Sequence, residues 1–416
     1  MNGCGDVFIV TFIDTTVNSI LREWRDLWPG GLSQREYSVL NLMAQCRGGG
    51  LGYNRAECDH CGEKQWFPSS CGDRHCPMCL GPRQAQWSEN VCGRLPDCPH
   101  FHVVFTLPEE LRAFFESNYR IAATEFFAAA AETLELFMRN NWRMRGGFLA
   151  VLHTWGSDLN WHPHLHVLAC AGGADTGTGE WRQARANYMF PVKAMSKVFG
   201  AIMLRRLEAL EGADVDAGEG SAIQWPPECR SVEDRRAWRV GLARRSWNIS
   251  SRPTLRNTRA VVRYLARYTS RIAISNARVL RVDGDERTVT YGWKDYRNGG
   301  TKRETTLGGK DFIRRFTRHL VPKGLRRVRY FGIIAGRSGV CREIPGSPQG
   351  SIAEKAPEKP GKPCVECGRQ RFSYDYFYIA GTSVASCSER TGKRFSLGEL
   401  EWTRAGPENG VQQGGC

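Results

Sequence analysis

Two closely spaced pairs of cysteines constrain the fold of this 416-residue chain more than any other feature. Cys58 and Cys61 form the first pair, and Cys76 and Cys79 form the second pair after an interval of 14 residues. A Cys-x2-Cys turn presents two thiolates to one metal ion, and two such turns complete the tetrahedron that structural Zn²⁺ adopts. We therefore predict a zinc-binding module over residues 46–92 with these four cysteines as its ligands.

Other potential metal ligands leave alternatives to this set. Cys71, His60 and His75 lie inside the same block, and each is a candidate to replace one of the four ligands. Cys364 and Cys367 form one more Cys-x2-Cys pair near the end of the sequence. A single isolated pair is weak evidence for a metal site, so we assign it no role.

The composition places the chain in a broad class. Hydrophobic residues make up 41% and aromatic residues 11%, which is enough for real cores, and the length suggests two or three domains. No stretch approaches the roughly 18 uncharged apolar residues of a membrane span. Asp6 and Asp14 flank the apolar segment 7–13 and no basic segment precedes it, so we expect no signal peptide. The sequence predicts a soluble, intracellular protein whose 16 cysteines do not form a disulfide framework.

The positive charge is concentrated in one stretch. The whole chain has a net charge of +15, and residues 251–340 alone carry 22 Lys and Arg against 6 Asp and Glu. Tyrosine and tryptophan residues are interleaved with these basic residues. Arginine suits phosphate groups and aromatic rings suit stacked bases, so the stretch favours a nucleic-acid-binding groove over a solvated surface. This feature does not separate DNA from RNA.

Hydrophobic spacing predicts a mixture of helices and strands. Ser33 and Glu36 have the spacing of a capping box at the start of one helix. The segment 212–228 is rich in Gly, Asp, Ala and Pro, which predicts a surface loop. The predicted helices cover residues 14–28, 33–46, 109–142, 190–212 and 258–274, and the predicted strands cover residues 101–107, 146–155, 163–171 and hairpins within 279–308.

A cluster of histidines falls on the two adjacent predicted strands. His164 and His166 are two residues apart, so on a strand both imidazoles face the same side while Leu165 faces the other. A hairpin would bring His153 of the preceding strand beside them. Three imidazoles suit Mn²⁺ or Zn²⁺, and they accept Mg²⁺ when phosphate oxygens and water complete the coordination shell.

Two tyrosines lie four residues apart on the predicted helix 258–274. Tyr264 and Tyr268 therefore present both hydroxyl groups from one helical face. A tyrosinate that attacks a phosphodiester keeps a covalent 5′-phosphate, and nearby arginines and a divalent metal ion offset its charge. The same tyrosines also fit an apolar stripe of core residues, so their interpretation depends on the histidines and the basic stretch. Arginines of the same helix repeat with this spacing: Arg263, Arg267 and Arg271.

Taken together, these features resemble the HUH endonuclease superfamily, and more closely the two-tyrosine transposases of the insertion sequence ninety-one family. The order of the motifs, with the histidines before the tyrosines, is that of replication initiators rather than conjugative relaxases. The matching segments are SCGDRHCPMC (70–79), FHVVFTLP (101–108), VLHTWGSDLNWHPHLHVL (151–168), RYLARYTSRIAISN (263–276) and DFIRRFTRHLVPKGLRRVRYFG (311–332).

The resemblance implies a fold and a reaction. The fold would be α+β, with a central antiparallel sheet flanked by helices, an N-terminal helical and zinc-binding module, and a basic C-terminal segment. His164 and His166 would hold a catalytic Mg²⁺ or Mn²⁺, with His153 as the third ligand and His162 as the alternative. Tyr264 and Tyr268 would be the nucleophiles that cleave and transfer one DNA strand.

Further expectations follow from the resemblance. The partners would be single-stranded DNA and hairpins at transposon ends, with no nucleotide cofactor and no membrane, in the cytoplasm at the bacterial nucleoid. The oligomeric state is not predicted. The arginines expected at DNA are Arg263, Arg267, Arg271, Arg314, Arg315, Arg326, Arg327 and Arg329. The expected divisions are a helical segment 1–45, the zinc-binding module 46–92, the endonuclease domain 93–276 with a surface loop 213–235, a basic DNA-binding segment 277–340, and a poorly ordered tail 341–416.

Two other functions fit parts of the sequence. A rolling-circle replication initiator or relaxase-type nickase would use the same groups on a plasmid origin. A zinc-containing nucleic-acid-binding protein without catalysis would need metal at the cysteines only. A zinc hydrolase is disfavoured because no glutamate accompanies the histidines.

Overall fold

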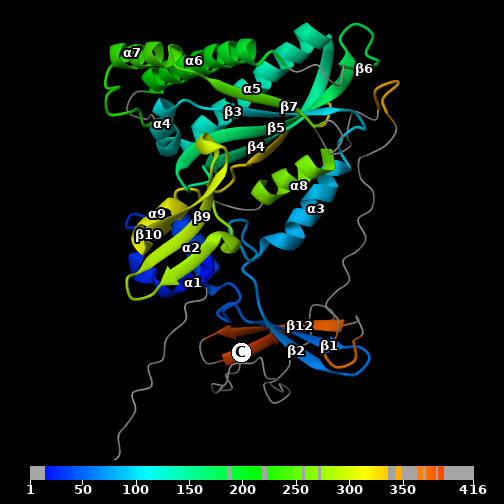
Figure 1. Cartoon of the computed structure of the whole chain (residues 1–416), viewed down its shortest axis with the longest axis vertical. Coiled ribbons are helices and arrows are strands. Elements are labelled where there is room, and N and C mark those ends of the chain that lie inside the picture. Colours follow the sequence, from blue (N-terminus) through cyan, green and yellow to red (C-terminus); the bar gives the residue numbers. More distant parts are fainter. Residues whose placement is uncertain are drawn as a thin grey trace, which may run out of the picture. The chain divides into compact units, whose positions relative to one another are not determined.

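A computed structural model of the chain shows two compact units (Figure 1). The first unit comprises Met1–Gly81, Ile274–Arg314 and Ala356–Cys416, and the second comprises Pro82–Ala273 and Arg315–Lys355. Within the described ranges, no helix is long and apolar enough to cross a membrane. The structure describes residues 15–184, 190–217, 223–254, 258–269, 273–335, 343–348, 364–368, 372–380 and 383–387.

The first unit begins with two short helices. α1 (Val17–Glu23) and α2 (Gln34–Gln45) flank a single 3₁₀ turn, η1 (Arg25–Leu27). The Ser33 hydroxyl accepts the Glu36 N–H, and the Glu36 carboxylate accepts the Ser33 N–H. This reciprocal pair confirms the predicted capping box, and such a cap stabilises a helix by about 1 kcal/mol.

Two antiparallel sheets complete the first unit. Their strand orders are β13-β12-β1-β2 and β10-β9-β8. The second of these sheets contains the hairpins predicted within residues 279–308. The tail expected to be poorly ordered supplies β12 and β13. The strands are β1 (Tyr53–Cys58), β2 (Lys64–Pro68), β8 (Val279–Asp283), β9 (Thr288–Asp295), β10 (Thr301–Gly308), β12 (Phe372–Ala380) and β13 (Ser383–Cys387).

A six-stranded antiparallel sheet forms the centre of the second unit. Its strand order is β11-β4-β5-β3-β7, and β6 pairs with β5. The central strands β4 and β5 are almost entirely buried because helices cover both faces of the sheet (Figure 1). The strands are β3 (His100–Thr106), β4 (Met144–Trp155), β5 (Trp161–Asp175), β6 (Trp181–Gln183), β7 (Asn248–Pro253) and β11 (Val328–Gly332).

The two faces of this sheet carry different helices. On one face, Leu149, Val151 and Leu168 pack in a common core cluster with Val262 and Leu265 of α8. On the other side lie the long helices α5 and α6 (Figure 1). The architecture confirms the predicted α+β fold with a central antiparallel sheet flanked by helices. The helices of this unit are α3 (Leu80–Cys92), α4 (Arg112–Ser117), α5 (Tyr119–Trp142), α6 (Val192–Ala217), α7 (Val232–Ala243) and α8 (Thr258–Thr269). Most of α9 (Gly309–Thr317) belongs to the first unit.

Several elements of the second unit were not predicted from the sequence patterns, namely α3, α7, β6, β7 and β11. The predicted loop 213–235 includes the beginning of α7, where Ser231 and Asp234 form another capping box. β7 is an edge strand of six residues that pairs with β3 and has no marked apolar alternation. β7 was missed because its pairing with β3, and not a local pattern, holds it in place, whereas the Ser231–Asp234 capping box of α7 is a local signal that the predicted loop overlooked.

Gly332 gives a test of how tightly the edge of this sheet is packed. It has a φ of +58°, and a Cβ atom there would lie 2.0 Å from the carbonyl oxygen of Gly146. We expect Gly332→Ala to lower the free energy of unfolding by at least about 1–3 kcal/mol, measured by denaturant unfolding. Gly241→Ala in α7 is the control: its Cβ meets open space, so up to about 1 kcal/mol of stabilisation is expected. A Gly332→Ala protein with the wild-type free energy of unfolding would contradict this close packing.

Candidate functional site

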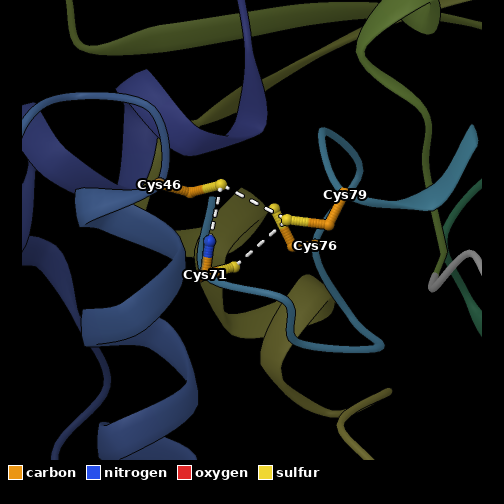
Figure 2. Close-up of side chains that lie close together, drawn as sticks. All are labelled: Cys46, Cys71, Cys76 and Cys79. Atoms are coloured by element: carbon orange, nitrogen blue, oxygen red, sulfur yellow. Dashed lines mark hydrogen bonds between the residues drawn. The ribbon is translucent and has the colours of Figure 1, made fainter. Parts of the chain in front are cut away.

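Four cysteines of the first unit converge on one point (Figure 2). Cys46 ends α2, Cys71 follows β2, and Cys76 and Cys79 form a turn before α3. The Cys79 sulfur lies 3.4 Å from the Cys46 sulfur and 3.5 Å from the Cys71 sulfur. A Zn²⁺ ion bound at about 2.3 Å to four sulfurs would separate them by about 3.8 Å, so the group could hold one zinc ion.

Buried polar contacts hold this group in place. The Asn18 side-chain amide donates to the Cys76 sulfur over 3.2 Å and to the Met43 carbonyl over 2.8 Å. The Cys71 N–H donates to the Cys46 sulfur over 3.3 Å. Hydrogen bonds of this kind favour thiolates, and the Cys46 and Cys71 thiols likewise lower the pKa of Cys79. The pKa values of Cys71 and Cys76 are raised, chiefly by the Cys46 thiol, so without a metal ion these contacts favour the thiolate only at Cys46 and Cys79.

The structure corrects the predicted grouping of the zinc ligands. Cys76 and Cys79 lie with Cys46 and Cys71, whereas Cys58 and Cys61 lie in a separate group. The spacing of a Cys-x2-Cys pair reveals a turn but does not reveal which other turn faces it. Cys46 was missed because no short spacing marks it. The two histidines considered as replacements stand outside both groups, and one of them, His75, pairs with Asp73 over 2.6 Å.

The second cysteine group combines residues that are far apart in the sequence. Cys58 and Cys61 lie beside Cys364 and Cys367, the pair that was assigned no role from the sequence. The Cys58 sulfur lies 3.6 Å from that of Cys367, and the Cys61 sulfur lies 3.6 Å from that of Cys364. All four belong to the first unit.

Three histidines gather on the central sheet of the second unit. His153 of β4 stands directly opposite His164 of β5, and His166 follows two residues later on the same face. The ring centroids of His153 and His166 are 4.4 Å apart, and those of His164 and His166 are 4.9 Å apart. One nitrogen from each of the three rings falls within 4.8 Å of the others, so the group could hold a metal ion. The alternative His162 stands outside it and contacts Arg112 over 3.1 Å.

Neighbouring groups orient two of these rings. His164 donates its Nδ1–H to the carbonyl of His162 over 2.7 Å. His166 Nδ1 lies 2.8 Å from Nε2 of His102, a β3 residue whose ring stacks on it. With Nδ1 engaged in both cases, Nε2 is the nitrogen that would bind a metal ion. His102 was missed, although it lies within the predicted strand 101–107.

Burial keeps these imidazoles neutral at physiological pH. Burial lowers the pKa of His164 to about 4. The pKa values of His153 and His166 fall well below the ordinary value, first through burial and then through the neighbouring histidines. A neutral imidazole is the form that coordinates metal ions. A cation could therefore bind these imidazoles without first displacing protons from them.

The tyrosine helix α8 covers this same face of the sheet. Leu149 and Val151 continue into His153 along β4, and Leu168 shares its face with His164 and His166 along β5. The α8 side chains Val262 and Leu265 pack on that row of leucine and valine residues. The structure describes the backbone of Tyr264, Arg267 and Tyr268 within α8, but not their side chains, and Arg271 lies outside the described residues.

A polar contact holds the beginning of α8. The Thr258 hydroxyl lies 3.3 Å from Nδ1 of His100, and Nε2 of the same ring lies 3.5 Å from the Cys170 sulfur. Cys98, His100 and Cys170 also meet geometrically as three potential ligands. Because both ring nitrogens of His100 already have partners in a largely apolar core, we interpret this group as structural. It places the beginning of α8 at the end of the sheet face away from His164.

Two of the arginines expected to bind DNA pack against aromatic rings of the protein. Arg327 is only 4% exposed, and its guanidinium carbon lies 6.0 Å from the centre of the Trp155 ring. That ring stacks on His153, so Arg327 lies behind the histidine group. Arg329 lies over the Phe127 ring at 4.4 Å. Arg327 therefore belongs to the interior and Arg329 is half-buried, whereas Arg326 and Arg263 are exposed.

Part of the basic stretch is neutralised locally. In the first unit, Arg287 pairs with Asp26 over 2.6 Å, and Arg314 pairs with Asp311 over 2.9 Å. In the second unit, Arg315 donates to Asn160 over 3.1 Å. Aromatic residues of the stretch also differ, because Tyr291 is fully buried whereas Tyr296 is 71% exposed. Only some of these groups can face a nucleic acid.

Two family models together cover most of the chain. A transposase zinc-binding domain matches residues 16–107, and a model described as a putative transposase matches residues 147–342. The first match includes the Cys46 group, and the second includes the histidines and α8. The class of protein is therefore a transposase with an N-terminal zinc-binding domain.

Comparison with curated proteins gives the family. The chain is 33% identical over 366 residues to "Putative transposase y4qJ" of Sinorhizobium fredii, covering 86% of this chain and 87% of the relative. It is 31% identical over 317 residues to "Transposase for insertion sequence element IS801" of Pseudomonas savastanoi pv. phaseolicola, covering 75% and 73%. The chain belongs to the insertion sequence ninety-one family of transposases.

Solved structures give a weaker likeness. The chain aligns with "Conjugative Relaxase TrwC in complex with OriT Dna. Metal-free structure." at 16% identity, over 40% of this chain and 71% of that chain, with a TM-score of 0.20. A second solved structure of that relaxase, described as a copper-bound complex with OriT DNA, gives 17% identity over 40% of this chain and 68% of that chain, also with a TM-score of 0.20. A TM-score at this level does not establish a shared fold.

A buried histidine close to this site predicts acid sensitivity. Burial lowers the pKa of His319 to about 3, whereas the unfolded chain titrates near 6.5. Between these values the unfolded state binds the extra proton, so the contribution is intact above pH 6.5 and declines as the pH falls toward 3. We expect His319 to lower the free energy of unfolding by about 1.4 kcal/mol more at pH 5.5 than at pH 7.5.

The measurement is denaturant unfolding at both pH values for the wild type and His319→Gln. Glutamine keeps a donor for the Leu159 carbonyl, which Nε2 of His319 contacts over 3.2 Å, but does not titrate. Between pH 7.5 and pH 5.5, the free energy of unfolding should fall less in His319→Gln than in the wild type. An equal fall in both proteins would contradict the lowered pKa of His319.

Proposed function

We propose that this transposase cuts and transfers single DNA strands through a covalent tyrosine intermediate. Tyr264 and Tyr268 are the nucleophiles, and His153, His164 and His166 hold a divalent cation. The single observation that carries the proposal is the position of α8 on the sheet face that presents the three histidines. Membership of a transposase family supports DNA as the substrate.

The donor set of the histidine group fits a divalent cation. His153 and His166 are buried and His164 is half-buried, all three have lowered pKa values, and hydrogen bonds orient two of them. Three protein ligands leave coordination positions open, so phosphate oxygens and water can complete the shell of Mg²⁺ or Mn²⁺. A cation bound there would neutralise charge on the scissile phosphate.

The chain's own residues would carry out the exchange of bonds. A tyrosine hydroxyl loses its proton to solvent, and its oxygen forms a bond to phosphorus while the bond to the 3′-oxygen breaks. The 3′-oxygen takes up a proton, which leaves a free 3′-hydroxyl and a 5′-phosphotyrosine. Attack by another 3′-hydroxyl reverses these steps and joins strands. The phosphotyrosine conserves the bond energy, so this scheme needs no nucleotide cofactor.

Positive charge close to the histidines supports binding of a phosphate. The exposed Arg263 lies on α8 one residue before Tyr264, where it could contact a phosphate directly. Arg327 is buried behind His153, so it would contribute only the field of its charge. A guanidinium group is a strong partner for phosphate oxygens and stays charged at all relevant pH values. Single-stranded DNA from the ends of the insertion sequence, including hairpins, is the substrate that we infer.

A covalent adduct tests the proposed nucleophiles. With an end-derived oligonucleotide and Mn²⁺, we expect the wild type to form a protein–DNA adduct that survives denaturation. Tyr264→Phe combined with Tyr268→Phe should reduce the adduct at least about a thousandfold, because both nucleophilic oxygens are removed. Gel electrophoresis and mass spectrometry of the linked peptide measure the adduct and locate the tyrosine.

Tyr37→Phe is the matched control because this exposed tyrosine lies on α2, in the first unit. It should leave the adduct unchanged. An adduct that persists in the double variant, or that forms fully in excess chelator, would overturn the assignment. Cleavage of a plasmid origin, with no reaction on end DNA, would instead indicate a replication initiator.

Salt dependence tests the contribution of the exposed arginines. We expect Arg326→Gln to weaken binding to all single-stranded sequences and to reduce the slope of log K against log salt by about 0.7, the value for one lost phosphate contact. Fluorescence anisotropy with labelled oligonucleotides measures this slope. Arg327→Gln should instead lower the unfolding temperature, because that side chain is buried. A slope unchanged in Arg326→Gln would assign its charge to a solvated surface.

A further inference from the structure

The second cysteine group has the dimensions of a metal site. Its sulfur atoms all lie within 4.8 Å of one another, and Cys58–Cys367 and Cys61–Cys364 are each 3.6 Å apart. A disulfide bond would need about 2.05 Å. A tetrahedron of sulfurs about a zinc ion at about 2.3 Å has edges of about 3.8 Å, which is close to the observed separations.

The two halves of this group are built alike. In the first, the Gly62 N–H donates to the Cys58 carbonyl over 2.9 Å, and in the second the Gly368 N–H donates to the Cys364 carbonyl over 2.9 Å. Both glycines have a φ of +72°, a conformation that glycine adopts without strain. Two segments more than 300 residues apart thus fold into the same Cys-x2-Cys-Gly turn.

Strand pairing brings the two turns together. β1 ends at Cys58, and β12 begins just after the second turn. These strands are antiparallel neighbours, and Cys58 pairs in register with Phe372. Each turn is therefore attached to one of two adjacent strands, at the same end of the pair.

The backbone of the first turn is directed at one of the sulfurs. The N–H groups of Cys61 and His60 point toward the Cys58 sulfur. Backbone donors directed at a cysteine sulfur are expected in a turn that presents thiolates to a metal ion.

We propose that Cys58, Cys61, Cys364 and Cys367 form a second structural zinc site, independent of the Cys46 group. Its ligands come equally from the N-terminal zinc-binding domain and from a segment beyond residue 342, where the transposase family match ends. The site closes a loop of about 300 residues and fastens β12 to β1. The site uses neither the tyrosines nor the histidines, so the evidence for or against it is independent of the proposed reaction.

Alkylation of the full-length protein tests which cysteines share an ion. Metal-bound thiolates react slowly with N-ethylmaleimide, and peptide mass spectrometry reads each position separately. Under graded chelation of the wild type, Cys58, Cys61, Cys364 and Cys367 should become reactive together, separately from Cys46, Cys71, Cys76 and Cys79. Joint release of Cys58, Cys61, Cys76 and Cys79 would overturn the proposal.

A double cysteine variant provides a second test of the proposed zinc site. Cys364→Ser with Cys367→Ser should lose one zinc ion per chain by mass spectrometry of the metal, and Cys58 and Cys61 should become alkylated while the Cys46 group stays protected. Cys229→Ser, a buried cysteine outside the four ligand groups of the described residues, is the control and should keep all its zinc. Unchanged zinc in the double variant, or disulfides Cys58–Cys367 and Cys61–Cys364 in the native protein, would refute the site. If the double variant does not fold, the wild-type measurement decides alone.

Discussion

The register between β4 and β5 is the constraint on which the histidine group depends. His153 faces His164 across this pair, and Val151 faces His166. Because successive side chains of a strand point to opposite faces, a slip of one residue would turn one set of imidazoles toward α5 and separate the group. The same register aligns the leucine and valine residues under α8. One set of backbone hydrogen bonds therefore positions both the potential metal ligands and the helix that carries the tyrosines.

Burial gives the site its chemical character. Buried imidazoles lose affinity for protons, and the hydrogen bonds between His166 and His102 and from His164 to the His162 carbonyl give ring nitrogens of His166 and His164 a partner. Arg327 adds a permanent positive charge close by, which further opposes protonation of His153. Such an environment disfavours additional protons and favours a group with high negative charge, and a phosphodiester next to a divalent cation satisfies that condition.

Local pattern predicted more of this fold than of its sites. The alternation around His153 and His164 predicted both central strands, and the Ser33–Glu36 spacing predicted the start of α2. The helix of Tyr264 and Tyr268 was predicted from residue 258, where it begins. The grouping of the cysteines was wrong because it depends on which strands pair, and the partner of β1 lies more than 300 residues away. Cys46 and His102 were missed because each acts through neighbours that are distant in sequence.

The pairing of β1 with β12 has a consequence for synthesis of the chain. Residues 53–58 leave the ribosome long before residues 372–377, with which they pair. At roughly 5–20 residues per second, the delay is on the order of tens of seconds, during which that edge of β1 has no strand beside it. An open strand edge is a template for unwanted association with other chains. The nascent zinc-binding region therefore depends on its other contacts, or on chaperones, to stay unaggregated until translation is almost complete.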